Sequence, residues 1–222
     1  MVKAVIFDCD GVLVDSEVLF HAVEIEVLTE FGLAYDSRAF KARFLGMSDN
    51  AYYQALDLDA QERLGRSIIA ELRPRMRTRV LERFATELQA VPGALDAVNA
   101  VRLPKAVASS SGVNALAHKL QRFDLWAPFD PHIYSAELVP HAKPAPDIFL
   151  HAAEKLGVAP ADCLVIEDSV NGVKAALAAG MTVWGFSGGA HMDDHLSDLL
   201  IAAGAQRQVA SWADARPLFS AL

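Results

Sequence analysis

Four short apolar runs, each followed at once by polar residues, recur along the chain. The first covers residues 4–7, contains no polar gap, and ends at Asp8-Cys9-Asp10-Gly11. Uninterrupted runs of β-branched and aromatic residues are typical of strands that are buried on both faces. The later runs cover residues 106–108, 164–166 and 182–186. The pattern therefore predicts four buried strands with polar residues at their carboxyl ends.

Helical patterns separate the later strands, over residues 113–123, 147–156 and 172–179. Ser111 is the expected N-cap of the first helix, and a glycine follows each of the other two. Short buried strands that alternate with helices of about 10 residues predict an α/β fold with a doubly wound, Rossmann-like parallel sheet. In such a sheet, ligands bind at the carboxyl ends of the strands, where the strand order reverses.

Residues 16–87 break this alternation, because their apolar positions recur only with the helical period of 3.6 residues. We expect an inserted α-helical cap domain over 16–87, within an α/β core formed by 1–15 and 88–222. The Val91-Pro92-Gly93 turn marks the return to the core. Within the cap, the pattern predicts helices at 17–30, 36–43, 49–56, 59–71 and 74–87.

The composition is that of a globular protein, with 222 residues, 53% hydrophobic residues and a formal net charge of −8. A negative protein lacks the broad basic face that nucleic acid requires, so we expect no nucleic-acid partner. No run approaches the roughly 18 apolar residues of a membrane span. The acidic residue Asp8 comes too soon after the N-terminus for this segment to be a secretory signal. We expect a soluble, cytoplasmic monomer with reduced cysteines and no membrane partner.

Asp8 and Asp10 lie one residue apart at the end of a predicted strand, so their side chains point the same way. One carboxylate, ionised, can attack phosphorus as a nucleophile. The other, kept protonated by its neighbour and by burial, can protonate the leaving oxygen and later activate water. Attack on an anionic phosphate requires a cation. Glu167 and Asp168 provide the hard oxygens that suit Mg²⁺.

Two further polar segments point to the same chemistry. Lys143, in a loop stiffened by prolines, is a compact cation that can pair with the nucleophile and with phosphate oxygens. Ser109, with Ser110 and the backbone N–H groups that follow, can hold other phosphoryl oxygens at a helix N-terminus. Each signal is weak when taken alone. Their joint placement at the ends of separate parallel strands predicts a single site.

The order of these segments resembles that of the haloacid-dehalogenase-like hydrolase superfamily, over essentially the whole chain. The resemblance rests on four motifs in the expected order. They are Phe7-Asp8-Cys9-Asp10-Gly11, which looks like the first motif in its phosphatase form, then Ser109, Lys143 and Glu167-Asp168.

This resemblance implies that Asp8 is the nucleophile and forms an aspartyl phosphate, with Asp10 as general acid and base. Ser109 and Lys143 would complete the catalytic set. It also implies a Mg²⁺ cofactor held by the Asp8 carboxylate, the Asp10 backbone carbonyl and the Asp168 carboxylate, with Glu167 behind them.

The helical insert resembles the cap of the subgroup that includes β-phosphoglucomutase and many sugar-phosphate phosphatases. The mutases carry a histidine where this chain has Phe20, with His21 one position later, and an arginine where this chain has Asp49. Because a mutase needs a second phosphate clamp, we favour a phosphatase acting on a sugar phosphate or phosphorylated sugar acid. A phosphosugar mutase is the alternative. A phosphoacceptor signalling module is a second alternative, although such receivers are about half this length.

The cap offers few clues to the substrate. Residues 73–79 contain four arginines, most of which we expect on a solvated face, with Arg75 or Arg79 left to bind an anionic group of the substrate. His191, Asp193, Asp194 and His195 are interpreted as surface polarity and local structure rather than as a zinc site. The candidate substrate contacts are Phe20, His21, Gly46, Met47, Ser48, Arg75 and Ser110.

Overall fold

The computed structural model describes residues 1–44, 47, 49–219 and 222, without the side chains of 37–38, 41–42 and 49–50. The described residues divide into two compact units. The core unit comprises Met1–Asp15 and Gln89–Leu222, and the helical unit comprises Ser16–Leu88. This division falls within one residue of the 16–87 boundaries suggested by the sequence. That the helical unit acts as a cap stays a prediction.

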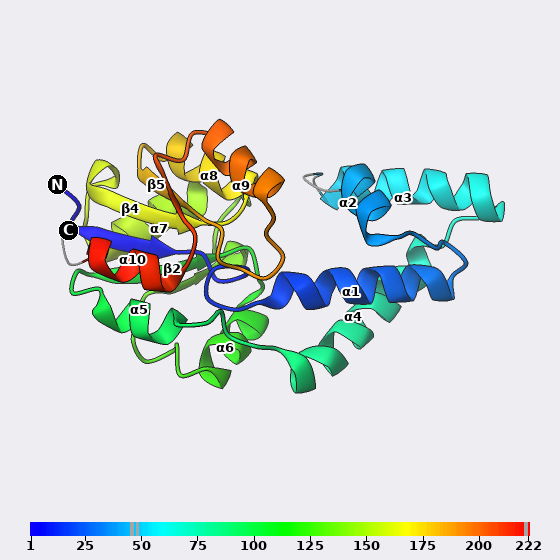
Figure 1. Ribbon diagram of the computed structural model, residues 1–222, viewed down its shortest axis with the longest axis horizontal. Helices are drawn as coiled ribbons and strands as arrows, with labels where there is room; N and C mark the ends of the chain where they lie inside the picture. The colour runs from blue at the N-terminus through cyan, green and yellow to red at the C-terminus, as the bar shows by residue number, and fades with distance from the viewer. Residues whose placement is uncertain (45–46, 48, 220–221) are drawn as a thin grey trace. The chain divides into compact units, whose positions relative to one another are not determined.

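The core unit is built on a parallel sheet, which confirms the predicted fold class (Figure 1). In the described part of the chain the sheet has six strands in the order β3-β2-β1-β4-β5-β6. The strands are β1 Ala4–Phe7, β2 Lys105–Ser109, β3 Ile133–Ser135, β4 Cys163–Glu167, β5 Thr182–Phe186 and β6 Arg207–Val209.

The sequence pattern missed the two edge strands, β3 and β6. Each is only three residues long. In β6, Arg207 and Gln208 are exposed, so the segment has no apolar run to mark it. These strands are defined by backbone pairing with β2 and β5, and a pattern of side chains does not record that pairing.

Helices cover both faces of the sheet (Figure 1). On one face, Ile6 belongs to an apolar cluster with Phe149 and Val173, which lie on the helices that follow β3 and β4. On the other face, the Phe7 ring lies 5.8 Å from the Trp212 ring. The helices of the core unit are α5 Ala94–Ala100, α6 Val113–Arg122, α7 Asp147–Leu156, α8 Val170–Ala178, α9 Asp194–Ala202 and α10 Trp212–Phe219.

The strand order reverses at β1, which lies between β2 and β4. Phe7, the last residue of β1, is in register with Val107 of β2 and with Ile166 of β4. The residues that follow these positions therefore leave the sheet at the same edge. This places Asp8 next to the polar ends of two other strands, at the reversal point where ligands bind in such sheets.

The helical unit contains α1 Ser16–Glu30, α2 Ser37–Phe44, α3 Asp49–Leu64 and α4 Ile69–Glu87 around its own apolar core. The predicted helices 49–56 and 59–71 were wrong, because a single helix runs on to Leu64. Asp57 and Leu58 contain no helix breaker, whereas Gly65 has a positive φ of 70° that ends the helix. Pro74 lies inside α4 rather than at its start.

The arginine run lies on α4 and pairs with α1. Arg79 contacts Glu26 and lies 2.9 Å from a Glu30 oxygen, and Arg75 lies 3.1 Å from Glu30. These contacts join two helices that are far apart in sequence, so the guanidinium groups have a structural role within the helical unit. A role for Arg75 in substrate binding stays a prediction.

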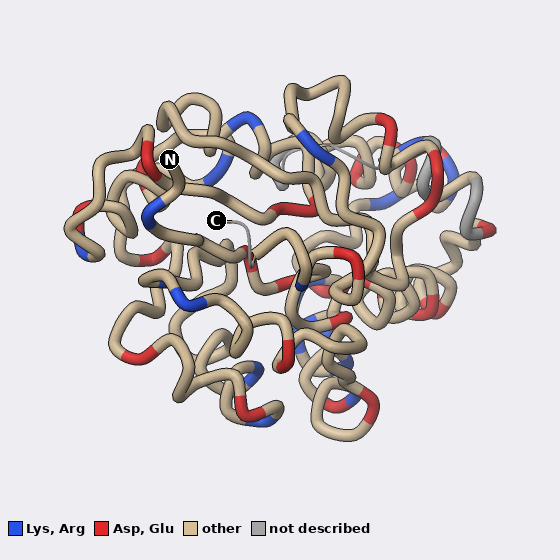
Figure 2. The backbone as a smooth tube through the Cα atoms, turned by 60° about the vertical axis from the view of Figure 1, so that its left-hand side comes forward, with Lys and Arg blue, Asp and Glu red and all other residues tan. Residues whose placement is uncertain are grey.

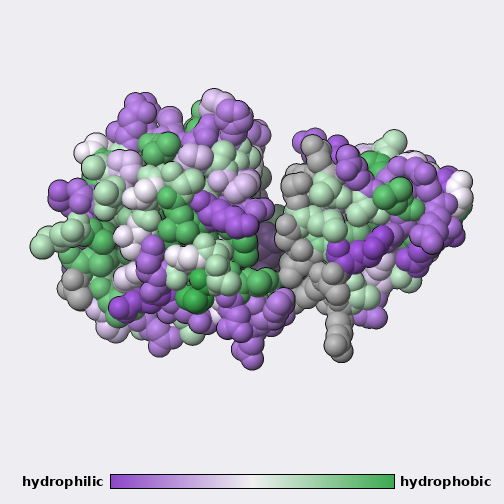
Figure 3. Space-filling model, turned by 90° about the horizontal axis from the view of Figure 1, so that it is seen from above, coloured by the Kyte–Doolittle hydropathy of each residue, from purple (hydrophilic) through white to green (hydrophobic). Residues whose placement is uncertain are grey.

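Charged positions of both signs are interspersed along the described chain (Figure 2). Hydrophilic side chains also occupy much of the surface of each unit in the view of Figure 3. No helix among the described residues combines the length and the apolar character needed to cross a membrane.

Candidate active site

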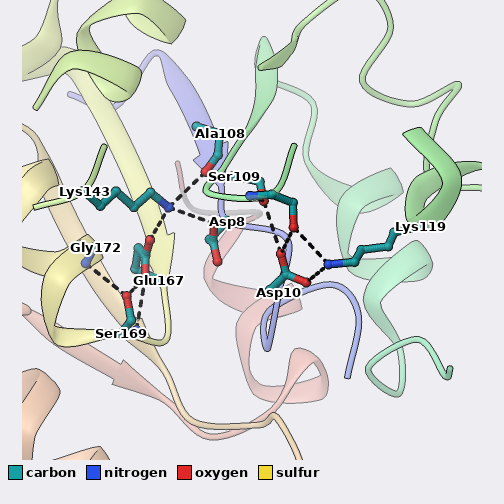
Figure 4. A network of polar contacts seen from close by, with 10 residues as sticks. Asp8, Asp10, Ala108, Ser109, Lys119, Lys143, Glu167, Ser169 and Gly172 are labelled. Atoms are coloured by element: carbon teal, nitrogen blue, oxygen red, sulfur yellow. Dashed lines mark hydrogen bonds and ion pairs between the residues drawn. The ribbon is translucent and has the colours of Figure 1, made fainter. Parts of the chain in front are cut away.

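Lys143 joins two buried carboxylates at the carboxyl edge of the sheet (Figure 4). It lies in the loop before α7, and its Nζ donates to Asp8 Oδ1 at 2.8 Å and to Glu167 Oε1 at 2.5 Å. A third bond, to the backbone oxygen of Ala108 in β2, is 3.0 Å long. The side chains of Lys143, Asp8 and Glu167 are only 5%, 9% and 0% exposed. The structure thus brings together three residues predicted from separate segments.

Burial sets the electrostatics of this group. Burial raises the pKa of Asp8 well above its usual value, and the negative charges of Glu167, Asp168 and Asp10 raise it further, while Lys143 opposes the shift. For Lys143, burial favours the neutral amine, but Asp8 and Glu167 outweigh it and hold the pKa above its ordinary value. Asp8 and Glu167 therefore favour the charged form of Lys143. Ionised Asp8 is most stable when further positive charge is near.

Glu167 is fixed by the start of the next helix. Its Oε2 accepts bonds from the backbone N–H and the hydroxyl of Ser169, at 3.1 and 2.9 Å. Ser169 also caps α8, because its Oγ accepts the Gly172 N–H at 3.0 Å. A Cβ at position 172 would overlap the Glu167 carboxylate, so only glycine fits there. Both carboxylate oxygens of Glu167 are thereby engaged, by Lys143 and by Ser169.

The described residues contain one cluster of acidic side chains whose oxygens lie close enough together to hold a metal ion. It consists of Asp8, Glu167 and Asp168, and their ligand atoms lie within 4.8 Å of one another. Three buried carboxylates with a single lysine between two of them leave an excess of negative charge. Hard oxygens in that arrangement are the donors that Mg²⁺ prefers. The residues present therefore fit a magnesium ion, with Asp8 and Asp168 better placed as ligands than the engaged Glu167.

Asp168 is supported by a residue that the sequence interpretation assigned elsewhere. His191 Nε2 lies 3.0 Å from Asp168 Oδ2, and the His191 side chain is only 11% exposed. The interpretation of His191 as surface polarity was therefore wrong. Gly11, with a φ of 72°, makes room for this pair, since a Cβ there would overlap the Asp168 carboxylate. Asp193 instead caps α9, accepting the Leu196 N–H at 2.9 Å.

Asp10 lies beside a second polar group, formed by β2 and α6 (Figure 4). Its Oδ2 accepts bonds from Ser111 Oγ at 2.7 Å and from Ser109 Oγ at 3.3 Å. Its Oδ1 contacts the ammonium group of Lys119, which also donates to Ser111 Oγ at 2.9 Å. The prediction that Ser111 caps the following helix was wrong, because Gly112 occupies that position and the Ser111 hydroxyl bonds to Asp10.

The helix N-terminus near Ser109 is partly engaged within the protein. Ser109 is fully buried, and its Oγ accepts the Ser111 N–H at 3.0 Å. Glu137 Oε2 accepts the Val113 N–H of α6 at 3.0 Å. Ser110, by contrast, is exposed. Binding of a phosphoryl group by Ser109, Ser110 and their backbone stays a prediction.

The candidate substrate residues of the helical unit remain predictions. Phe20 and Met47 are 39% and 40% exposed. His21 Nδ1 lies 3.2 Å from the buried Glu24 carboxylate. Gly46 and Ser48 lie outside the described residues.

The chain is similar to known hydrolases and phosphatases, both in sequence and in structure. The model of a family described as "Hydrolase: haloacid dehalogenase-like hydrolase" matches residues 2–180. The 6-phosphogluconate phosphatase of Escherichia coli K12 is 30% identical over 190 residues, which cover 86% of this chain and 85% of that protein. Hexitol phosphatase B of the same organism is 34% identical over 187 residues, 81% of each chain. A crystal structure of a HAD family hydrolase from Deinococcus radiodurans R1, with bound phosphate and sodium, has a TM-score of 0.82 and 33% identity, covering 99% of this chain and 96% of that one.

Proposed function

We propose that this chain, which belongs to the haloacid dehalogenase-like hydrolase family and is a phosphatase, removes the phosphate from a small phosphorylated sugar or sugar acid. The observation that carries the proposal is the convergence of buried Asp8, Lys143, Glu167 and Asp168 at the sheet edge, with Asp10 beside them. We also propose that the protein is a monomer and is located in the cytoplasm.

In the first step, an Asp8 carboxylate oxygen attacks phosphorus. A new oxygen–phosphorus bond forms as the bond from phosphorus to the sugar oxygen breaks, and Asp10 gives a proton to that sugar oxygen. Lys143 holds Asp8 in place and offsets charge as the phosphate approaches. We assign to Ser109, whose Oγ lies 3.3 Å from Asp10 Oδ2, the donation of a hydrogen bond to a phosphoryl oxygen.

In the second step, Asp10 takes a proton from water while the water oxygen bonds to phosphorus. The bond between phosphorus and Asp8 then breaks, which releases inorganic phosphate and restores both aspartates. Mg²⁺, when bound, supplies the positive charge that lets ionised Asp8 approach an anionic phosphate. The carboxylates of Asp8 and Asp168 and the Asp10 backbone carbonyl would hold this ion, with Glu167 behind them.

The relatives and the helical unit support the proposed substrate class. Both curated relatives named above are phosphatases, and their names denote phosphorylated sugar derivatives. We assign the helical unit the role of a cap that excludes bulk water and selects the substrate. The residues proposed to contact the substrate are Phe20, His21, Gly46, Met47, Ser48, Arg75 and Ser110.

The test is turnover of p-nitrophenyl phosphate with Mg²⁺, followed by a screen of phosphorylated metabolites. We expect Asp8→Asn to abolish turnover, and Asp10→Ala to accumulate an aspartyl phosphate that acid quenching preserves for mass measurement. Removal of Mg²⁺ with a chelator should abolish activity reversibly. Full turnover by Asp8→Asn would refute the nucleophile, and the absence of a trapped phosphoenzyme in Asp10→Ala would refute the role of Asp10.

A further inference from the structure

Lys119 is a buried cation that none of the motifs at the strand ends contains. It lies in the last turn of α6, eight residues after Ser111, and it is only 6% exposed. Its ammonium group contacts Asp10 Oδ1 (Figure 4). It also donates to Ser111 Oγ at 2.9 Å. Lysines are rarely buried without a partner of opposite charge, because an unpaired buried charge is costly in free energy. Asp10 provides that partner for the Lys119 ammonium group.

The charges around the site divide into two sets. Lys143 lies between Asp8 and Glu167, and Lys119 contacts Asp10. Without Lys119, the Asp10 carboxylate would lose this buried positive charge and would keep the hydroxyl donors of Ser109 and Ser111. It would then be less firmly oriented, and it would repel an incoming phosphate that already meets several carboxylates.

We propose that Lys119 is a positioning residue for Asp10 in phosphoester hydrolysis. With Ser111, it holds the Asp10 carboxylate beside Ser109, so that one group can serve both proton transfers. This proposal rests on the proposed function above. Proton transfer requires the donor and acceptor atoms to lie within hydrogen-bond reach, and a displacement of about 1 Å can cost a factor of about 100 in rate.

The leaving group separates the two steps in which Asp10 acts. The leaving group p-nitrophenolate is stable without a proton, so the first step with p-nitrophenyl phosphate needs little help from Asp10. The second step, attack by water, needs Asp10 with every substrate. With an alkyl phosphate such as glycerol 2-phosphate, the first step needs Asp10 as well. Loss of Asp10 positioning therefore affects the two substrates in different ways, whereas a general structural defect affects both equally.

The experiment compares Lys119→Met with Lys155→Met, which removes an exposed lysine from the last turn of α7. With p-nitrophenyl phosphate, we expect Lys119→Met to give a burst of nitrophenol followed by turnover that is slower by about 10- to 100-fold. The aspartyl phosphate should accumulate, as seen by mass after acid quenching. With glycerol 2-phosphate, turnover should fall without accumulation. Lys155→Met should behave like the wild type.

Two further variants keep the test decisive. Ser111→Ala removes one donor to Asp10 and should produce the same pattern more weakly. In an Asp10→Ala background, Lys119→Met should change the rates no further, because its partner is gone. An equal loss in both backgrounds, or equal losses with both substrates and no phosphoenzyme, would overturn the proposal. Full activity of Asp8→Asn would instead refute the phosphatase mechanism itself, independently of Lys119.

Discussion

Replacing Lys143 by methionine removes the only cation that contacts the Asp8 and Glu167 carboxylates among the described side chains. Methionine keeps most of the length and apolar volume of the lysine stem. In the wild type, the Lys143 ammonium group lies 4.8 Å from the centre of the Phe149 ring. The substitution therefore removes the charge and the three hydrogen bonds of the ammonium group while it keeps the apolar stem. It leaves two carboxylates that are 9% and 0% exposed without their ammonium partner.

Breaking a buried ion pair by removing one partner costs about 3–5 kcal/mol, because the remaining charge is buried and uncompensated. We expect the core unit of Lys143→Met to lose about that much free energy of unfolding near neutral pH. The pKa of Asp8 is already raised by burial, and loss of Lys143 removes the cause that lowers it. The native state then binds the Asp8 proton more tightly than the unfolded chain does. The variant's deficit should therefore grow as pH rises from 5 to 8 and shrink as Asp8 becomes protonated.

The chain offers a selective probe for this measurement. Its three tryptophans, Trp126, Trp184 and Trp212, all lie in the core unit, so urea unfolding followed by tryptophan fluorescence reports on that unit. Lys155→Met serves as the exposed-lysine control and should change the unfolding free energy by less than about 0.5 kcal/mol. Added Mg²⁺ should restore part of the loss in Lys143→Met, because a cation that binds only the native state stabilises it.

Two results would refute this reasoning. A loss below about 1 kcal/mol at pH 8 would mean that the pair is solvated in solution, as surface ion pairs are. A loss that stays constant between pH 5 and 8 would mean that the buried Asp8 charge is not its source. Either result would also weaken the assignment of Lys143 as the cation that holds the nucleophile.

Three other predictions concern the two cysteine thiols, the His191 contact and the product of the reaction. Burial raises the pKa of the Cys163 thiol to about 11 and that of Cys9 well above its usual value, so neither should react with a thiol reagent at pH 8 until the protein is unfolded. His191→Leu should weaken Mg²⁺ binding by about tenfold, measured by calorimetry, while His191→Gln and the exposed control His195→Leu should not. Phosphorus NMR of a reaction with a hexose 1-phosphate should show inorganic phosphate and no hexose 6-phosphate, in the wild type and in His21→Ala alike; isomerised product would identify a mutase.

The residues at the strand ends were predictable because the sheet itself brings them together. An apolar run fixes where a buried strand ends, and parallel strands present their carboxyl ends at one edge. Asp8, Ser109, Glu167 and Asp168 could therefore be grouped before any contact was known. Lys143 was grouped with them by its loop and by family resemblance, and its bonds to Asp8 and Glu167 place it there.

The contacts missed by the sequence analysis depend on geometry that no local pattern records. Lys119 occupies an ordinary position near the end of an amphipathic helix, and only the direction of α6 brings its ammonium group to Asp10. His191 reaches Asp168 because Gly11 leaves room for the approach. In both cases the signal is a polar side chain that is buried, and burial is a property of the fold rather than of the segment.

Lys119 also bears on how one carboxylate can serve two opposite proton transfers. A general acid must be protonated when the sugar oxygen leaves, and a general base must be ionised when water attacks. Contact with a cation favours the ionised form, so Lys119 favours the second task at some cost to the first. An enzyme that releases phosphate to water must complete that second task in every cycle. The contact with Lys119 therefore favours the form of Asp10 that activates water against the aspartyl phosphate, as the proposed phosphatase requires.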